Sequence, residues 1–365
     1  MQKKIIALAI AGLASTAAFA QSNVTIYGSI DMGYSYRYDT INPRNHAISG
    51  IDSGQTQGNR LGFKGVEDLG NGLKAVFLLE SGFFADTGVD HTAGSMFSRQ
   101  AYAGLTGGFG TLIGGRLYTP HFSFVSSIDP FSAGTVGQYR NAYGMDRNAL
   151  LDPVRVDNAV AYVSPSFGGL TFTGAYSNNA AGQENAVDNS QNNTVYALLS
   201  RYTAGPVDIG LNLHRIAAAS NNGAVSTLKS IDNATLGGTF DAKVVKIHAL
   251  YSYNLMDNVA ASSDQRIENW MIGASVPVGK VTIKTSYMFS DGNTAAGGNT
   301  QQLALGANYA LSKRTDLYTA YAIIDNDSAK QANGTFIRRA AVVGDATNSG
   351  IGAQQGFQVG VRHTF

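Results

Sequence analysis

The chain ends on Gly356-Phe357-Gln358-Val359-Gly360-Val361-Arg362-His363-Thr364-Phe365, in which apolar residues alternate with polar or small ones. Phe357, Val359 and Val361 share one side of this period-two pattern, and the final residue, Phe365, falls on the same side. Such a pattern predicts a strand with one apolar and one polar face. A soluble domain seldom ends on such a strand, whereas a barrel that spans a membrane needs it to close the sheet onto its first strand. The segment therefore predicts the closing strand of a transmembrane β-barrel.

The N-terminus has the pattern of a secretory signal peptide. Lys3 and Lys4 are basic, residues 5–18 are apolar or small, and Ala18-Phe19-Ala20 matches an A-x-A cleavage site. The alternative, a membrane-anchoring helix, would need about 20 apolar residues and different flanks. We therefore expect residues 1–20 to be a signal peptide and residues 21–365 to form one exported domain.

Composition narrows the class of the exported part. It has no second long apolar run and no cysteine, so a membrane helix, a disulfide framework and a thiolate metal site are not expected. The 43 glycines, 18 tyrosines and 17 phenylalanines, with only 14% charged residues, suit many strands joined by tight turns. Without Lys3 and Lys4 the basic residues number 24 (26 minus 2) against 25 acidic ones, so the net charge is −1 and nucleic acid is not an expected partner.

Sixteen segments alternate in this way, with turn residues between them. The candidate strands are residues 24–37, 60–68, 73–84, 97–106, 110–116, 155–164, 170–177, 193–202, 207–217, 230–239, 244–254, 269–278, 281–291, 302–311, 315–324 and 356–365. Short turns alternate with long polar connections near 38–59, 85–96, 117–154, 178–192, 218–229, 255–268, 292–301 and 325–355. This asymmetry is typical of outer-membrane barrels. We predict an all-β fold, a transmembrane barrel of sixteen antiparallel strands.

The charged residues of the candidate strands fall on the polar side of the alternation. A basic residue that faces lipid at the bilayer midplane of a barrel costs about 2–4 kcal/mol, so these side chains are expected to line the interior. The lumen-facing candidates are Lys64, Glu80, Asp31, Asp157, Lys246, Lys284 and Arg362, together with Arg201 and Asp208. The alternative fold, a large soluble β-sandwich, would bury the apolar side in a core, and the signal peptide and the number of strands disfavour it.

A barrel of sixteen strands leaves an aqueous channel unless something fills it. The candidate partial plug is the third long connection, residues 117–154, whose aromatic side chains suit packing against the inner wall. An unusually long loop is more often functional than idle. We therefore expect an inward-folded constriction loop, with an external loop as the alternative.

The segments that carry these patterns resemble one family, the Gram-negative general-diffusion porins of the beta-proteobacterial type. The matching segments run through the whole exported chain: Val24–Gly28 and on to Asp31, Arg60–Gly70, Phe97–Leu105, Asn158–Tyr162, Leu311–Thr315 and Gly360–Phe365. The resemblance implies a homotrimer of sixteen-stranded barrels, each with a pore that the third loop narrows beside a basic cluster. The positions that match this cluster are Arg60, Arg99 and Arg155, with Asp129 as the acidic counterpart.

Alternation supports two of these three arginines. Arg60 and Arg155 lie on the polar side of their strands. Arg99 has the same parity as Ala101 and Ala103, so a regular strand would point it outward. Either this strand is bulged or Arg99 lies above the lipid band.

The predicted function is passive diffusion of ions and small hydrophilic solutes through the outer membrane of a Gram-negative bacterium, in contact with lipid and lipopolysaccharide. Basic residues outnumber acidic ones among the lumen candidates, which predicts a modest anion preference. Alternatively, these charges form balanced salt bridges that only support the wall. A substrate-selective channel and a surface adhesin or structural barrel are the alternative functions.

No enzymatic chemistry, metal site or cofactor is expected. The six histidines are scattered without metal-ligand spacing, and no H-E-x-x-H motif occurs. No motif marks a Ser–His hydrolytic pair either. A diffusion channel needs no cofactor, because the solute gradient supplies the driving force.

Overall fold

The computed structural model describes residues 23–38, 47–143, 151–180, 182, 193–217, 228–258, 265–292, 299–326 and 355–365. The predicted signal peptide, 1–20, and most of the predicted connection 325–355 lie outside the described residues. Within these ranges, no helix has both the length and the apolar character needed to cross a bilayer.

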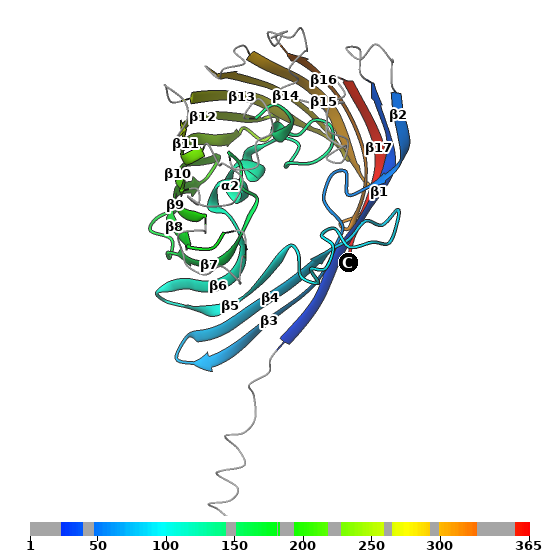
Figure 1. Cartoon of the computed structure of the whole chain (residues 1–365). Helices are drawn as coiled ribbons and strands as arrows, with labels where there is room; N and C mark the ends of the chain where they lie inside the picture. The colour runs from blue at the N-terminus through cyan, green and yellow to red at the C-terminus, as the bar shows by residue number, and fades with distance from the viewer. Residues whose placement is uncertain are drawn as a thin grey trace, which may run out of the picture.

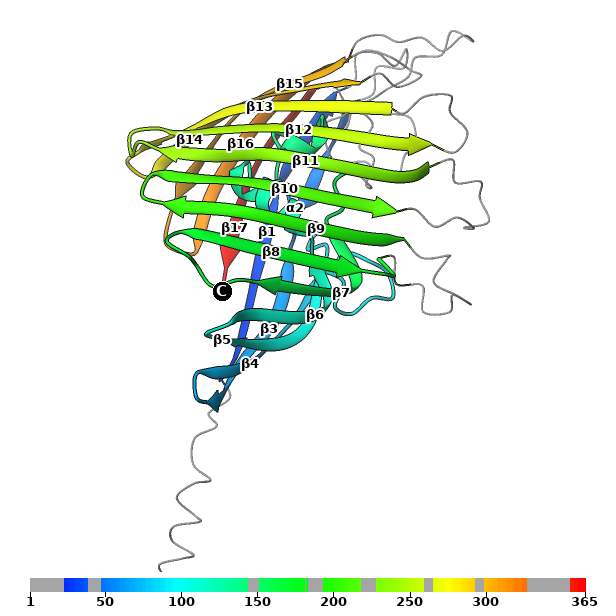
Figure 2. The same cartoon turned by 90° about the vertical axis from the view of Figure 1, so that its left-hand side faces the viewer.

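One closed antiparallel sheet forms the wall of the molecule (Figures 1 and 2). Its strands are β1 (Asn23–Tyr38), β2 (Ala47–Ser53), β3 (Arg60–Gly70), β4 (Leu73–Gly82), β5 (Gln100–Gly107), β6 (Gly110–Tyr118), β7 (Arg155–Val163), β8 (Leu170–Ser177), β9 (Thr194–Ala204), β10 (Val207–Ala217), β11 (Leu228–Asp241), β12 (Lys246–Asn258), β13 (Gln265–Val278), β14 (Val281–Gly292), β15 (Asn299–Ala310), β16 (Thr315–Asn326) and β17 (Gln355–Thr364). β2 pairs with residues 32–38 of β1 and β3 with residues 23–29, so these two strands share one place in the wall. Seventeen strands minus this shared place give the sixteen-stranded barrel that the sequence predicts.

The barrel closes where β1 meets β17. The two strands pair from Ser29 opposite Thr364 to Tyr38 opposite Gln355. Beyond this ladder, the backbones of Gly28 and Phe365 exchange two hydrogen bonds of 3.1 Å. A Cβ at Gly28 would lie 2.4 Å from the Phe365 ring, so only glycine lets the terminal aromatic residue lie over β1. The terminal segment is therefore the closing strand, as predicted.

Several strands extend further toward the long connections than the sequence patterns indicate, although β4 ends at Gly82 rather than 84 and β5 begins at Gln100 rather than 97. β2 lies inside the predicted connection 38–59. β12 continues to Asn258 rather than 254, and β13 begins at Gln265 rather than 269. Beyond the lipid band both faces of a strand meet water, so backbone pairing continues after the apolar–polar alternation has ended.

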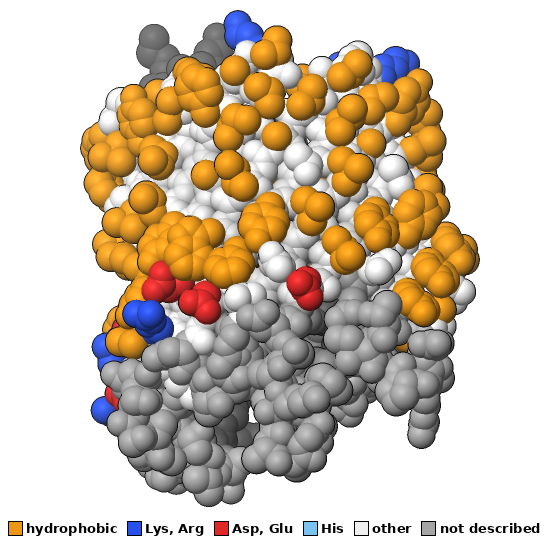
Figure 3. All heavy atoms as spheres, turned by 90° about the horizontal axis from the view of Figure 1, so that it is seen from above, with side chains coloured by type: hydrophobic (Ala, Val, Ile, Leu, Met, Phe, Trp, Pro, Cys, Tyr) orange, Lys and Arg blue, Asp and Glu red, His pale blue; other side chains and the backbone are white. Residues whose placement is uncertain are grey.

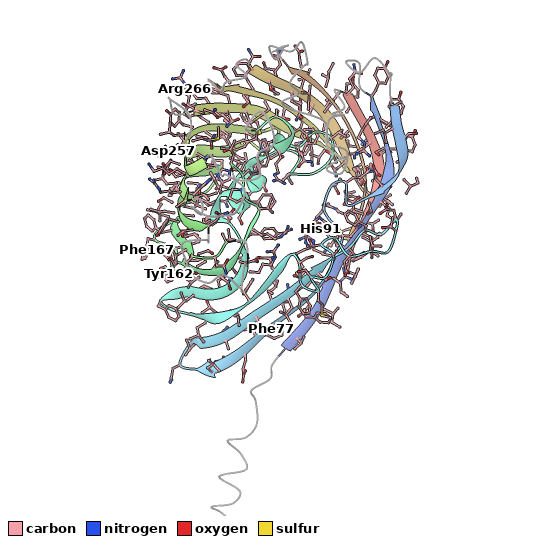
Figure 4. All side chains as sticks on the ribbon, viewed as in Figure 1. Phe77, His91, Tyr162, Phe167, Asp257 and Arg266 are labelled. Carbon is pink, nitrogen blue, oxygen red and sulfur yellow. The ribbon has the colours of Figure 1, made fainter. Side chains whose placement is uncertain are left out.

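The two faces of the wall differ in polarity. On the outer surface, apolar side chains form a broad band and charged side chains gather at its edges (Figure 3). Charged residues that face outward pair with each other near the long connections: Arg215 lies 3.4 Å from Asp232, and Lys229 lies 2.9 Å from Asp257. Tyr162 and Phe167 lie on the outer side of the wall, whereas His91 lies on the inner side (Figure 4). This is the arrangement that a lipid-embedded, water-filled barrel requires.

Candidate functional site

The third long connection enters the barrel as a short helix. α2 (Pro120–Ile128) begins after Thr119, whose hydroxyl accepts a hydrogen bond of 3.0 Å from the backbone N–H of Phe122, and proline occupies the first turn. The helix contacts the inner side of β8 to β12 (Figure 1). Phe124, Val125 and Ile128 have no exposed surface there. The described part of this connection therefore lies inside the barrel and against its wall.

Four glycines in the wall make room for the connection. A Cβ at Gly210 would lie 2.8 Å from the Phe124 ring, and a Cβ at Gly237 would lie 2.5 Å from Ile128. Further along, a Cβ at Gly273 would lie 2.5 Å from Pro130, and a Cβ at Gly306 would lie 2.8 Å from the Phe131 ring. Contacts below about 3 Å leave no space for a methyl group, so β10, β11, β13 and β15 form a seat that only glycine permits.

Hydrogen bonds fix the connection along this seat. The His248 ring lies 2.8 Å from the backbone oxygen of Ile128, and the Gln302 amide donates to the backbone oxygen of Gly137 at 3.0 Å. The backbone N–H of Val136 donates to Gln358 Oε1 at 2.8 Å. The connection thus follows the wall from β12 to β17 and leaves the inner side of β3 to β7 facing it.

Three arginines meet on that opposite side. Arg99 Nε donates to Glu80 Oε1 at 2.8 Å, and Arg60 Nη1 lies 3.5 Å from Glu80 Oε2. The Tyr27 hydroxyl donates to the same carboxylate at 2.8 Å. Glu80 is only 2% exposed, so its charge is directed at the two guanidinium groups.

Tyr118 joins the third arginine to this group. Its hydroxyl accepts a hydrogen bond of 2.7 Å from Arg99 Nη2 and one of 3.0 Å from Arg155 Nη2. The Arg155 guanidinium also lies 4.7 Å from the centre of the Tyr118 ring, a distance suited to a cation–π interaction. We call Arg60, Arg99, Arg155, Glu80 and Tyr118 the basic cluster. Its three guanidinium groups and one carboxylate carry a net charge of +2.

Arg99 does not have the outward orientation that regular alternation predicts. β5 begins at Gln100, so Arg99 lies before the strand. The alternation of inward and outward side chains along β5 therefore does not determine the direction of the Arg99 side chain. Its backbone N–H donates to the Glu80 backbone oxygen at 3.1 Å, which turns the side chain inward. Regular alternation therefore does not apply to Arg99, because period two holds only where the backbone is extended and paired.

Asp129 lies within the third connection and caps its helix. The carboxylate accepts hydrogen bonds from the backbone N–H groups of Phe131, Ala133 and Tyr139 at 3.1, 2.9 and 3.2 Å. Burial raises the pKa of this carboxyl to about 6, although these donors and Lys284 act in the opposite direction. The carboxylate that the structure brings against the arginines is Glu80.

The other predicted lumen residues divide into residues that have a hydrogen-bond or ion-pair partner and three lysines. Asp31 is fully buried and bonds the backbone of Thr56 and Gln57, so it holds the segment between β2 and β3. Asp157 pairs with Arg116, Asp208 with Arg201, and Arg362 with Asp316. Lys64 lies exposed over the Tyr27 ring, and Lys246 and Lys284 are half-buried.

Sequence reasoning missed the residues that position the arginines. Tyr27 and Tyr118 were not selected, because a tyrosine in a strand gives no sign of which distant side chain it bonds. His91 was dismissed as scattered. Burial and the nearby guanidinium groups of Arg155 and Arg99 lower its pKa, so this ring is neutral at pH 7. Among the described residues, no group of histidines and carboxylates could hold a metal ion.

Comparisons with known proteins agree with this geometry. The family model for Gram-negative porins matches residues 7–329. An outer membrane porin protein of Delftia acidovorans is 33% identical and one of Bordetella pertussis 30% identical, each over the full length of both chains. The solved structure of an anion-selective porin from Comamonas acidovorans is 29% identical, with a TM-score of 0.77 over 94% of this chain and all of that one. The chain therefore belongs to the Gram-negative porin family.

Proposed function

We propose that the chain forms a water-filled channel for passive diffusion of ions and small hydrophilic solutes, with a modest preference for anions. It is an outer-membrane protein of a Gram-negative bacterium, as its family and its closed barrel indicate. The basic cluster is the observation that carries the anion preference. Its net charge of +2 lies on the inner wall, and fixed charge of one sign raises the local concentration of the opposite ion.

The pairing within the cluster argues against charges that merely balance each other. Arg60 and Arg99 share one carboxylate, Glu80. Arg155 has a phenol hydroxyl as its hydrogen-bond partner and no acidic partner among the described residues. The Comamonas acidovorans relative, at 29% identity, is described as anion-selective, which supports the same preference here.

We also propose that the third connection narrows the pore opposite this cluster. Its contacts with β8 to β12 and with Gln302 and Gln358 hold it inside the barrel. Anions would then pass between the connection and the three arginines. Residues 1–20 serve as the cleaved signal peptide in this proposal.

The outer surface supports a homotrimer with β3 to β6 at the subunit contact. Lipid-facing strands of outer-membrane barrels carry aromatic girdles. Of the described strands, β7 to β9 and β11 to β17 each carry a largely exposed aromatic ring, whereas the largely exposed apolar side chains of β3 to β6 are aliphatic and their outward rings, Phe63 and Phe77, are only partly exposed. The remaining wall would contact lipid, and the outward charges at its edge would contact lipopolysaccharide.

Charge reversal at the cluster tests the anion preference. Arg60→Glu and Arg155→Glu each change the charge of the inner wall by −2, so both should shift the reversal potential in a salt gradient toward cations. Lys313→Glu makes the same change in an exposed turn and should have no effect. If both cluster variants kept the wild-type ion preference, the proposal would be wrong.

A further inference from the structure

Two lysines flank one strand of the inner wall, next to the docked third connection. Lys246 of β12 is paired with Ser275 of β13, and Ser275 is paired with Lys284 of β14. All three side chains point into the lumen, because they share the inward parity of His248 and Gly273, whose positions contact the third connection. Each is partly exposed, so a solute in the lumen can reach it.

The small side chain of Ser275 leaves an open position between the two lysines. In the neutral His248 ring, Nδ1 donates to the backbone oxygen of Ile128, and Nε2 accepts from the Ser275 hydroxyl at 3.1 Å. The hydroxyl is therefore held toward β12. The charges of Lys246 and Lys284 both act on the His248 ring, so the two ammonium groups lie near the same point of the wall.

The spacing of the strands lets both ammonium groups reach one ligand. Adjacent strands lie about 4.8 Å apart, so the Cα atoms of Lys246 and Lys284, two strands apart, are separated by about 10 Å. A lysine side chain is a flexible four-carbon stem that ends in three donors. Two such stems can converge over Ser275 on one anion.

The nearby carboxylates are bound to other groups. They belong to Asp129, Asp208, Asp241 and Asp316. Two of them form ion pairs with arginines, and the other two accept hydrogen bonds from backbone N–H groups. Neither Lys246 nor Lys284 has an ion-pair partner among the described residues. Their two positive charges are therefore available to a solute.

We propose that Lys246 and Lys284 bind small oxyanions of charge −2, the class to which sulfate and hydrogen phosphate belong. A tetrahedral dianion over Ser275 would offer oxygens to both ammonium groups, whereas a monoanion gains about half of that attraction. This inference rests on the proposed function, because it assigns a class of solute to the same channel. The basic cluster distinguishes ions by the sign of their charge, and the lysine pair distinguishes anions by its magnitude.

Sulfate and methanesulfonate are suitable probes, since both are tetrahedral and of similar size but differ in charge. The purified mature protein is placed in a planar bilayer at neutral pH. Chloride conductance and reversal potential are recorded first, and they report on the proposed function alone. Each probe is then added at constant chloride concentration, and the concentration that halves the chloride conductance is measured. Sulfate should act at a concentration about tenfold lower than methanesulfonate.

Matched variants locate the effect. The double variant Lys246→Gln/Lys284→Gln should reduce the difference between the probes to about twofold or less. Lys280→Gln/Lys313→Gln removes the same charge from exposed turns and should keep the difference. Ser275→Asp, which places a carboxylate between the lysines, should also remove the difference, and Ser275→Ala should not. The two Ser275 variants carry the test if the double lysine variant does not fold.

Two outcomes would overturn the inference even in a working anion channel. Equal half-blocking concentrations of sulfate and methanesulfonate in the wild type would exclude a site that prefers dianions. A sulfate preference that survives the loss of both lysines but disappears in Arg60→Gln would assign the binding to the basic cluster. Absence of chloride conductance before any probe is added would instead contradict the proposed function.

Discussion

Glu80 holds the basic cluster together and also reduces its charge. The carboxylate touches Arg60 and Arg99 and accepts a hydrogen bond from Tyr27, so one residue fixes the positions of two guanidinium groups. At the same time it lowers the net charge of the cluster from +3 to +2. Position and charge can be separated, because a glutamine keeps the shape of the side chain and loses the charge.

Glu80→Gln should therefore make the channel more anion-selective. Removing one unit charge a few ångströms from an ion path in water should change the anion-to-cation permeability ratio about threefold or more. The reversal potential in a salt gradient measures this ratio. Glu67→Gln, at an exposed position of β3, is the control. A ratio that stays constant or falls in Glu80→Gln would mean that the cluster does not lie on the ion path.

Asp129 should make the ion preference depend on pH. Its pKa is raised to about 6, above the ordinary value of 3.8, so the folded protein favours the protonated form. The contribution of this group to stability is therefore fully present below pH 3.8 and is lost as the pH rises through about 6. Protonation also removes a negative charge from the interior, so the anion preference should increase as the pH falls from 7 to 5.

Asp129→Asn should abolish this step. Asparagine keeps one side-chain oxygen as an acceptor for the backbone N–H groups and cannot be titrated in this range. Reversal potentials of wild type and variant between pH 7 and 5 provide the measurement. A wild-type curve without a change near pH 6 would contradict the prediction, and an unchanged step in Asp129→Asn would show that another group titrates.

At the level of elements, the sequence predicted the strands whose two faces meet lipid and water. All sixteen wall positions follow from alternation, because one face of each strand meets lipid and the other meets the lumen. β2 was missed, since beyond the lipid band both faces are wet and the alternation disappears. Alternation could not give the orientation of Arg99, because this residue precedes β5.

The seat of the third connection could not be predicted from the sequence. Gly237 and Gly273 look like ordinary strand glycines, and their contacts, Ile128 and Pro130, lie more than a hundred residues earlier in the chain. Nor could the pairing of Glu80 with Arg60 and Arg99 be predicted, because alternation gives the side of the wall but not which lumen residues meet. Contacts between distant segments arise from barrel closure, which no local pattern encodes.

The glycine seat leads to a prediction about pore size. Gly273→Val should push Pro130 away from the wall, because a Cβ at this position already lies 2.5 Å from the proline ring. Overpacking of this kind costs about 1–3 kcal/mol, enough to loosen the docked connection while the barrel still folds. Single-channel conductance should change from the wild-type value and become less uniform between openings. Gly174→Val, where nothing lies within 4 Å of the added Cβ, should conduct like the wild type.

For the whole molecule, the outer surface implies two environments. The largely exposed apolar side chains of strands β3 to β6 are aliphatic, whereas β1, β7 to β9 and β11 to β17 each expose an aromatic ring. Ala103 of β5 and Ala249 of β12 are both exposed small residues on the outer face, one in each region. They allow the proposed subunit contact to be tested with one substitution type.

Ala103→Trp should dissociate the trimer, and Ala249→Trp should not. A bulky ring cannot fit into a packed subunit contact, but it is tolerated in lipid, where tryptophan is common near the interface. The apparent mass of the unheated protein in mild detergent reports the outcome. Trimers from both variants would exclude β5 from the contact.

The central claim is that the basic cluster makes an open channel prefer anions. It is tested most directly by the reversal potential of the purified wild-type protein in a planar bilayer under a salt gradient at neutral pH. Stepwise conductance with a reversal potential that favours anions is the expected result. A cation-favouring potential, or a folded barrel without conductance, would contradict the account.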